Sequence, residues 1–243
     1  MEEKTNLFYN FSQTQLGDII PKETALIVVD MQKYQVEKDN KLYRAANQTV
    51  PGILEYFVKE VEEKVTPNLR KLIDFCHDVG ITVIYTKFSS FRPDGSDFSK
   101  NIQAINELAK IQLGEVGFPY IFHPSSDIID KLKPEDSDFV IQKNTSGTFI
   151  STRLDSFLRN MGIETVLVSG VVTNFCVHST AREASDYGFQ SIIVDDCCAA
   201  WSTEIHKATL KSFGLFYGFV ITYEKLIKKI SRSMKKKKEV ALQ

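Results

Sequence analysis

The feature that most constrains this chain is the alternation of six short apolar runs with longer stretches of helical character. Residues 25–30 form a continuous apolar, β-branched run that ends on Asp30, which is typical of a buried strand. Further strands are predicted at 81–86, 138–143, 165–171, 190–196 and 219–222. Strands that alternate with helices predict an α/β fold of three layers, in which helices cover both faces of one parallel sheet.

The predicted helices lie between these strands. Residues 61–79 place apolar side chains on one helical face, and Gly80 supplies the stop. The segment 31–60 is rich in Tyr, Asn and Gln and predicts one short helix. Weaker helical patterns lie at 102–111 and 127–132, and clearer ones at 149–161, 176–187, 203–216 and 224–230.

The domain organisation follows from length and charge. A chain of 243 residues without a repeat or linker predicts one domain over 1–231, followed by a basic, flexible tail over 232–243. The net charge is −1, but residues 224–243 hold eight Lys or Arg against two Glu. Such a run is usually a solvated, frayed end, with nucleic-acid or membrane-surface binding as the alternative. We predict neither a nucleic-acid nor a membrane partner.

A cytoplasmic location is predicted from three absences in the sequence. Residues 1–13 contain no apolar run, so no signal peptide is expected there, and no stretch approaches about 18 consecutive apolar residues. The four cysteines form no C-x-x-C pair, which favours free thiols in a reducing compartment. They are Cys76, Cys176, Cys197 and Cys198.

Three reactive side chains follow predicted strands, where ligands bind in open α/β sheets. They are Asp30, Lys143 and Cys176. Each has a simpler interpretation: an acid that caps a helix, a solvated lysine, or an inert buried cysteine. Their common position at the strand ends favours a shared function.

The three residue types suit acyl transfer through sulfur. We expect Cys176 to open a helix, whose dipole, together with the Lys143 ammonium, lowers the thiol pKa and gives an alkylation midpoint below about pH 7.5. Asp30 is suited to take the thiol proton and return it to a leaving amine. Backbone N–H groups in 171–176 are available to an oxyanion.

These residues lie within longer motifs, ALIVVDMQ and KNTSGTFISTRLDSFLRNMGIETVLVSGVVTNFCVHSTAREASDYGFQSIIVDDCCAA. Over about residues 22–225 the chain resembles the isochorismatase-like cysteine hydrolases. The resemblance implies a six-stranded parallel sheet in the order 3-2-1-4-5-6. It also implies a catalytic triad of Asp30, Lys143 and Cys176, in which Lys143 must reach inward from an outer strand. It further implies a cis peptide between Val171 and Val172, and an oxyanion hole formed by the N–H groups of Val172 and Cys176.

The resemblance also bears on metals. Nicotinamidases of this family add a metal site with histidines after the first two strands, and the corresponding segments here, MQKYQVEKDN and TKFSSFRPDGSD, have none. We therefore predict no metal and no cofactor. The chain's histidines lie elsewhere, and surface or packing roles are expected for His77 and His206.

The predicted function is a cysteine-dependent amidohydrolase that cleaves a C–N bond of a small amide or of a ureido or carbamoyl compound through an acyl-enzyme. The alternatives are an isochorismatase-type vinyl-ether hydrolase, whose relatives lack the thiol, and a non-catalytic ligand-binding relative. A homodimer or homotetramer is expected from the resemblance. Arg92 is equally well explained as a solvated charge, and Trp201 as an interface anchor. The candidate substrate contacts are Gln32, Tyr34, Arg92, Phe149, Asn174 and Trp201.

Overall fold

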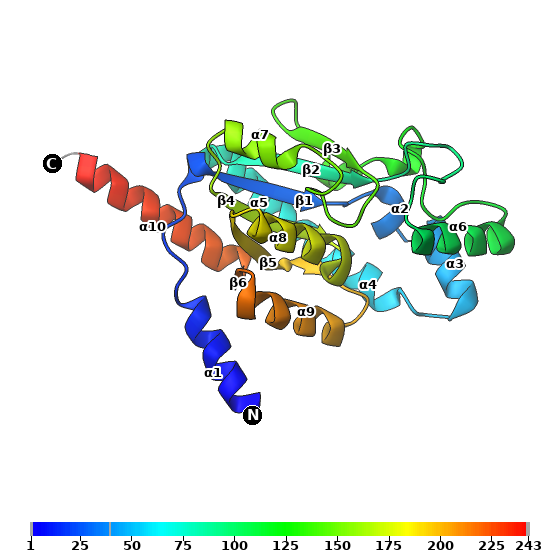
Figure 1. Ribbon diagram of the computed structural model, residues 1–243, viewed down its shortest axis with the longest axis horizontal. Helices are drawn as coiled ribbons and strands as arrows, with labels where there is room; N and C mark the ends of the chain where they lie inside the picture. The colour runs from blue at the N-terminus through cyan, green and yellow to red at the C-terminus, as the bar shows by residue number, and fades with distance from the viewer. Residues whose placement is uncertain (1, 39, 242–243) are drawn as a thin grey trace.

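The strands form one all-parallel sheet at the centre of the molecule (Figure 1). The computed structural model describes residues 2–38 and 40–241. The strand order is β3-β2-β1-β4-β5-β6, which confirms the order implied by the family resemblance. The strands are β1 Thr24–Val29, β2 Thr82–Phe88, β3 Phe139–Lys143, β4 Thr165–Val171, β5 Gln190–Ala199 and β6 Phe219–Ile221.

Two apolar cores lie on opposite faces of the sheet, because successive strand side chains point to opposite sides. Leu26 and Val28 pack on one face against α5 and α10, whereas Ala25 and Ile27 pack on the other against α7, α8 and α9. The bounds are α5 Thr66–Val79, α7 Leu154–Asn160, α8 His178–Asp186, α9 Thr203–Phe216 and α10 Tyr223–Ala241. The three-layer α/β/α prediction is confirmed.

The segment 31–60 differs from its prediction. It contains three helices, α2 (Lys33–Val36), α3 (Lys41–Thr49) and α4 (Glu55–Glu60), where one was expected. Each is too short to show a clear 3.6-residue period in the sequence. A π-helical segment, η2 (Val61–Val65), joins α4 to α5, so the predicted helix at 61–79 is the second part of a longer helical stretch.

Two other helical segments also depart from expectation. The pattern at 102–111 lies within a longer helix, α6 (Lys100–Leu113), but 127–132 holds only a 3-10 turn, η4 (Asp130–Leu132). The chain before η4 is extended, because Ile128 pairs with Gln32 and the Ile129 N–H donates to the Met31 carbonyl. Two further 3-10 turns are η1 (Pro21–Glu23) and η3 (Pro124–Ser126).

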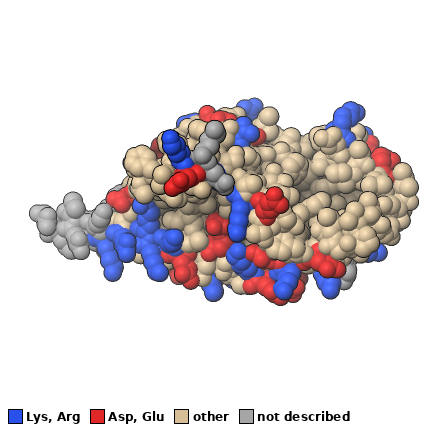
Figure 2. Space-filling model, turned by 90° about the horizontal axis from the view of Figure 1, so that it is seen from below, with Lys and Arg blue, Asp and Glu red and all other residues tan. Residues whose placement is uncertain are grey.

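The two ends of the chain form helices that extend from the sheet layers (Figure 1). Helix α1 (Glu2–Gln13) was not predicted. Gln13 joins it to α9 and β6. The Gln13 side-chain amide donates to the Gly214 carbonyl at 2.8 Å, and Gln13 Oε1 accepts from the Val220 N–H at 2.7 Å. Helix α10 passes the predicted boundary at 231 and remains helical to Ala241. Figure 2 shows Lys and Arg side chains gathered where α10 projects.

No helix within residues 2–38 and 40–241 is both long and apolar enough to cross a membrane. The predicted tail over 232–243 overlaps the end of α10, and residues 242–243 lie outside the described residues. The flexibility of that tail and the single-domain boundary stay predictions.

Candidate active site

Asp30 follows the central strand β1 and is fully buried. Its φ is +50°, in the left-handed region that Asp tolerates better than most residues. Its N–H donates to the Thr86 carbonyl at 3.2 Å, and its Oδ1 accepts from the Thr86 hydroxyl at 2.6 Å. These bonds from β2 hold the carboxylate at the carboxyl edge of the sheet.

Lys143 ends the outermost strand, β3, yet its ammonium reaches across β2 to Asp30. Its Nζ lies 2.7 Å from Asp30 Oδ2 and 4.8 Å from the ring centroid of Phe88, and both charged side chains are fully buried. Burial alone favours the neutral amine, but the opposite charge of Asp30 raises the pKa of Lys143 above its ordinary value. Lys143 is therefore a buried cation that Asp30 holds in its charged form.

The loop after β3 contributes the remaining partners of this ammonium. Lys143 Nζ donates to the carbonyls of Thr145 at 3.0 Å and Ser146 at 3.2 Å. The loop is anchored to α8 by Glu183, whose Oε2 accepts from the Phe149 N–H at 2.8 Å. A Cβ at Gly147 would overlap the Glu183 carboxylate, so a glycine there lets the loop approach α8 while Glu183 keeps this position. The inward reach expected of Lys143 is thus present.

Cys176 lies in a π-helical turn, η5 (Thr173–Val177), between β4 and α8, and only 1% of it is exposed. Strands β1 and β4 are neighbours in the sheet, which brings Cys176 and Asp30 to the same switch point. The thiol lies near enough to Asp30 and Lys143 for both charges to act on its pKa. The peptide bond between Val171 and Val172, just before this turn, is cis. The structure therefore brings Asp30, Lys143 and Cys176 into one buried cluster.

The expected lowering of the thiol pKa is wrong for this resting arrangement. Burial raises the pKa of Cys176 well above its ordinary value, the Lys143 ammonium lowers it, and the Asp30 carboxylate raises it again. Lys143 and Asp30 oppose each other, so burial decides the direction. At rest Cys176 is therefore a thiol that lies near the Asp30 carboxylate.

We expect the alkylation rate of Cys176 by iodoacetamide to keep rising above pH 8.5, the ordinary thiol value. In Asp30→Asn, the loss of the carboxylate leaves the Lys143 ammonium unopposed, so the pH midpoint should fall. The measurement is the alkylation rate against pH, with the modified cysteine mapped by peptide mass. A wild-type midpoint below about pH 7.5 would contradict the buried-thiol arrangement.

Cys176 lines a cavity of about 360 Å³, within the range of small-ligand sites. Two predicted contacts, Asn174 and Trp201, line it, as does Val172 of the predicted oxyanion hole. Most of the lining is apolar and was not foreseen from the sequence, because it comes from segments far apart in the chain. These residues are Leu42, Leu54, Phe57, Phe88, Ile102, Ile105, Phe118, Phe175 and Ile205.

The other four predicted contacts lie outside this cavity lining. Gln32 is buried, accepts from the Phe88 N–H at 2.7 Å and donates to the Ser126 carbonyl at 2.7 Å, so it ties loops together behind the site. Tyr34 is buried as well, and its hydroxyl donates to the Phe88 carbonyl at 2.8 Å. Both side chains thus support the wall of the site, and their contact with a substrate stays a prediction.

Arg92 and Phe149 are further from the expected role. The Arg92 side chain is 62% exposed and pairs with Asp94 at 3.0 Å within its own turn, as its simpler interpretation suggested. Phe149 is buried in the core under α7 and α8, where its ring stacks on Tyr187. Neither residue lines the cavity that contains Cys176.

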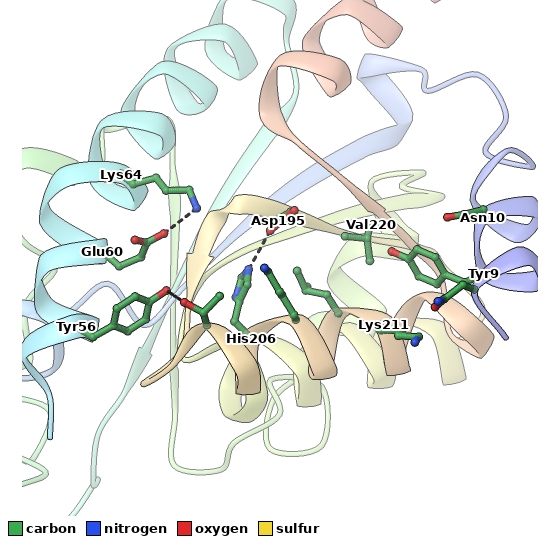
Figure 3. Close-up of a pocket in the computed structure, with 13 residues that line it drawn as sticks. Tyr9, Asn10, Tyr56, Glu60, Lys64, Asp195, His206, Lys211 and Val220 are labelled. Atoms are coloured by element: carbon green, nitrogen blue, oxygen red, sulfur yellow. Dashed lines mark hydrogen bonds and ion pairs between the residues drawn. The ribbon is translucent and has the colours of Figure 1, made fainter. Parts of the chain in front are cut away.

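A larger open groove of about 770 Å³ lies between α1, α4 and α9 (Figure 3). It holds an ion pair between Lys64 and Glu60 at 2.7 Å and a hydrogen bond between His206 and Asp195 at 2.9 Å. Neither Cys176 nor its two charged neighbours line it. This groove is separate from the buried cluster of Asp30, Lys143 and Cys176.

His206 links that groove to η5, the turn that contains Cys176, and its position in a predicted helix did not indicate this link. Its Nε2 faces Asp195, and its Nδ1 lies 2.9 Å from the hydroxyl of buried Thr173 in η5. The Asp195 carboxylate only accepts, so the ring donates to it through Nε2, and Nδ1 is hydrogen-bonded to the Thr173 hydroxyl. His206 thus has a structural role, in keeping with the packing role expected for it, and bridges α9, η5 and β5.

Three comparisons relate the chain to known proteins. The isochorismatase domain family matches residues 24–225. The ureidoacrylate amidohydrolase RutB of Acinetobacter baylyi is 30% identical over 217 residues, which are 83% of this chain and 81% of the relative. Nicotinamidase 3 of Arabidopsis thaliana is 26% identical, over 80% and 93% of the two chains. The crystal structure of a cysteine hydrolase from Pseudomonas syringae pv. phaseolicola 1448A matches with a TM-score of 0.76 and 25% identity, over 90% and 97%.

The parallel sheet, with a cavity at the carboxyl ends of its strands, defines an open α/β fold that binds ligands at this edge of the sheet. The chain belongs to the isochorismatase family, as the resemblance in its sequence implied. Its named relatives are hydrolases of C–N amide bonds.

Proposed function

We propose that this protein is a cysteine-dependent, metal-independent amidohydrolase that acts on a small amide or on a ureido or carbamoyl compound. The observation that carries the proposal is the buried cluster of Asp30, Lys143 and Cys176 beside a ligand-sized cavity. The relatives named amidohydrolase and nicotinamidase support the reaction class. A nucleophile, a base and a cation in one buried cluster are the parts that this chemistry needs.

In the proposed reaction, Cys176 Sγ attacks the substrate carbonyl carbon as Asp30 takes the thiol proton. The negative charge that develops on the carbonyl oxygen is held by the N–H groups of Val172 and Cys176, both of which line the cavity. The C–N bond then breaks, and Asp30 returns the proton to the leaving nitrogen. Water attacks the resulting thioester, with Asp30 taking its proton, and this step releases the acid and restores the thiol.

Lys143 acts in this scheme by stabilising charge. While Asp30 is negative, the ammonium balances it at 2.7 Å; once Asp30 carries the proton, the same ammonium favours the thiolate. Its partners hold it in place, so it has no need to move between the two states. We assign it no proton transfer.

The proposal extends to the setting of the enzyme. The four free cysteines support a cytoplasmic location, because reducing compartments keep thiols in that form. Exposed apolar side chains on α1, such as Phe8 and Phe11, support a homodimer or homotetramer.

Intact-protein mass spectrometry tests the acyl-enzyme directly. Wild type and Asp30→Asn are incubated with a panel of amides and ureido acids, and we expect an acyl-sized mass increase that maps to Cys176 because the thioester precedes hydrolysis. Cys176→Ala is the control and should show no adduct. Ammonia release by wild type without any adduct on Cys176, even after rapid acid quenching, would contradict covalent catalysis by this residue.

A further inference from the structure

The cavity beside Cys176 is unusual in its charge. In the described part of the chain sixteen residues line it, and none of them is Lys, Arg, His, Asp or Glu. Its polar lining consists of uncharged amides, a hydroxyl and the thiol, from Gln35, Ser99, Asn101, Asn174 and Cys176. Figure 2 shows a mostly uncharged surface over the end of the molecule where α3 and α6 lie. A charged substrate group would thus find no counter-ion in this lining.

Aromatic side chains form one wall of the cavity. The ring of Phe88 meets Phe118 edge to face at 5.7 Å between centroids and Phe175 at 6.4 Å. Phe175 precedes the nucleophile in the chain and is 39% exposed, so part of its ring is free to contact a ligand. Offset or edge contact with such rings favours aromatic or branched apolar groups.

The Lys143 ammonium has no free N–H donor and no unbalanced charge with which to bind an anionic substrate. An ammonium has three N–H donors, and Lys143 uses them on Asp30 Oδ2, the Thr145 carbonyl and the Ser146 carbonyl. Its charge is balanced by Asp30 at 2.7 Å. Arg92, the cation among the predicted substrate contacts, pairs with Asp94 and lies outside the lining.

On the basis of the proposed amidohydrolase function, we propose that the substrate is an uncharged amide. Its acyl part is a compact aromatic or branched aliphatic group. The apolar wall takes the acyl group, and the amides of Asn174 and Gln35 are the polar groups available to its substituents. Ureido acids and other carboxylate-bearing amides are poor substrates, because their charge would lose its hydration without gaining a partner. This proposal narrows the substrate class to neutral compounds.

Alkylating probes of Cys176 test this selectivity without requiring turnover. Iodoacetate, iodoacetamide and N-benzyl iodoacetamide react by the same displacement of iodide but differ in charge and apolar area. Each rate on Cys176 is mapped by peptide mass and divided by the rate of the same probe with glutathione at the same pH. We expect the normalised rate to be highest for N-benzyl iodoacetamide, lower for iodoacetamide and lowest for iodoacetate. The first and last rates should differ by at least about tenfold.

A matched pair of variants on α6 provides the control. Ile105 lines the cavity and is 41% exposed, whereas Ile111 on the same helix is 82% exposed and lies outside the lining. Ile105→Lys should raise the normalised iodoacetate rate about tenfold, since it adds a counter-ion. Ile111→Lys adds the same charge elsewhere and should leave the rate within about twofold.

Hydrolysis separates this proposal from the one on which it rests. Phenylacetamide and 3-ureidopropionate are compared by ammonia release, and faster turnover of phenylacetamide together with the expected probe order supports the inference. An iodoacetate rate equal to or above the benzyl rate, or preferred turnover of the ureido acid, overturns it while leaving the amidohydrolase intact. The expected probe order, without ammonia or a Cys176 adduct from any neutral amide, instead overturns the proposed function.

Discussion

Cys176→Ala is expected to lower kcat/KM on an amide substrate by at least about 10⁴-fold while the protein still folds. The substitution removes the atom that forms the acyl bond in the proposed mechanism, and the Asp30–Lys143 pair beside it cannot replace a nucleophile. The thiol is buried, so the loss of its sulfur should cost only about 1 kcal/mol of unfolding free energy. The measurements are ammonia release and urea unfolding.

Cys198→Ala is the matched control. Cys198 belongs to the same apolar core as Cys176 and is equally buried, at 1% exposure, but it does not line the cavity. We expect a similar loss of stability with kcat/KM unchanged within about threefold, in keeping with a substitution away from the reacting atoms. Equal activity losses in the two variants, or a Cys176→Ala enzyme as active as wild type, would eliminate Cys176 as the nucleophile.

The second large effect is expected from breaking the buried ion pair. Asp30→Asn leaves the Lys143 ammonium without a counter-charge, and Lys143→Met does the same to the Asp30 carboxylate. Both side chains are fully buried, so the remaining charge has no water around it either. Removing one partner of a buried pair costs about 3–5 kcal/mol. Asp30→Asn should also lower turnover about 10²–10⁴-fold, because the proton acceptor for the thiol is lost.

The double variant Asp30→Asn/Lys143→Met distinguishes stability from catalysis. It removes both charges, so its unfolding free energy should be higher than the two single losses added together predict, as expected for residues in direct contact. Its activity should remain as low as that of Asp30→Asn. Additive stability losses in urea unfolding would show that the two charges do not interact, and recovered activity would exclude Asp30 as the base.

Much of the fold was predictable from local sequence patterns. Strand β4 begins and ends where expected, and β1 within one residue, because a continuous β-branched run between polar residues has few alternatives to a buried strand. Helix α9 also matches its predicted bounds. In contrast, α1 was missed and 31–60 holds three helices where one was predicted, since short polar helices owe their stability to tertiary contacts more than to their own periodicity.

The residues of the candidate site also differ in how far the sequence predicted them. Reactive residue types at strand ends were sufficient to select Asp30, Lys143 and Cys176, because parallel strands place their carboxyl ends at one edge. The substrate contacts were less predictable: Asn174 and Trp201 line the cavity, whereas Gln32, Tyr34, Arg92 and Phe149 do not. Proximity to a triad residue in the sequence does not determine which way a side chain points.

The sequence by itself determined the strand succession, the positions of the three reactive residues and the family. Only the tertiary structure decided that Lys143 crosses β2 to pair with Asp30, that burial raises the thiol pKa of Cys176, and that an uncharged cavity lies beside it. Strand formation depends on neighbours along the chain. Charge pairing, desolvation and cavity lining depend on neighbours in space, such as Leu54 and Ile205, which no local pattern brings together.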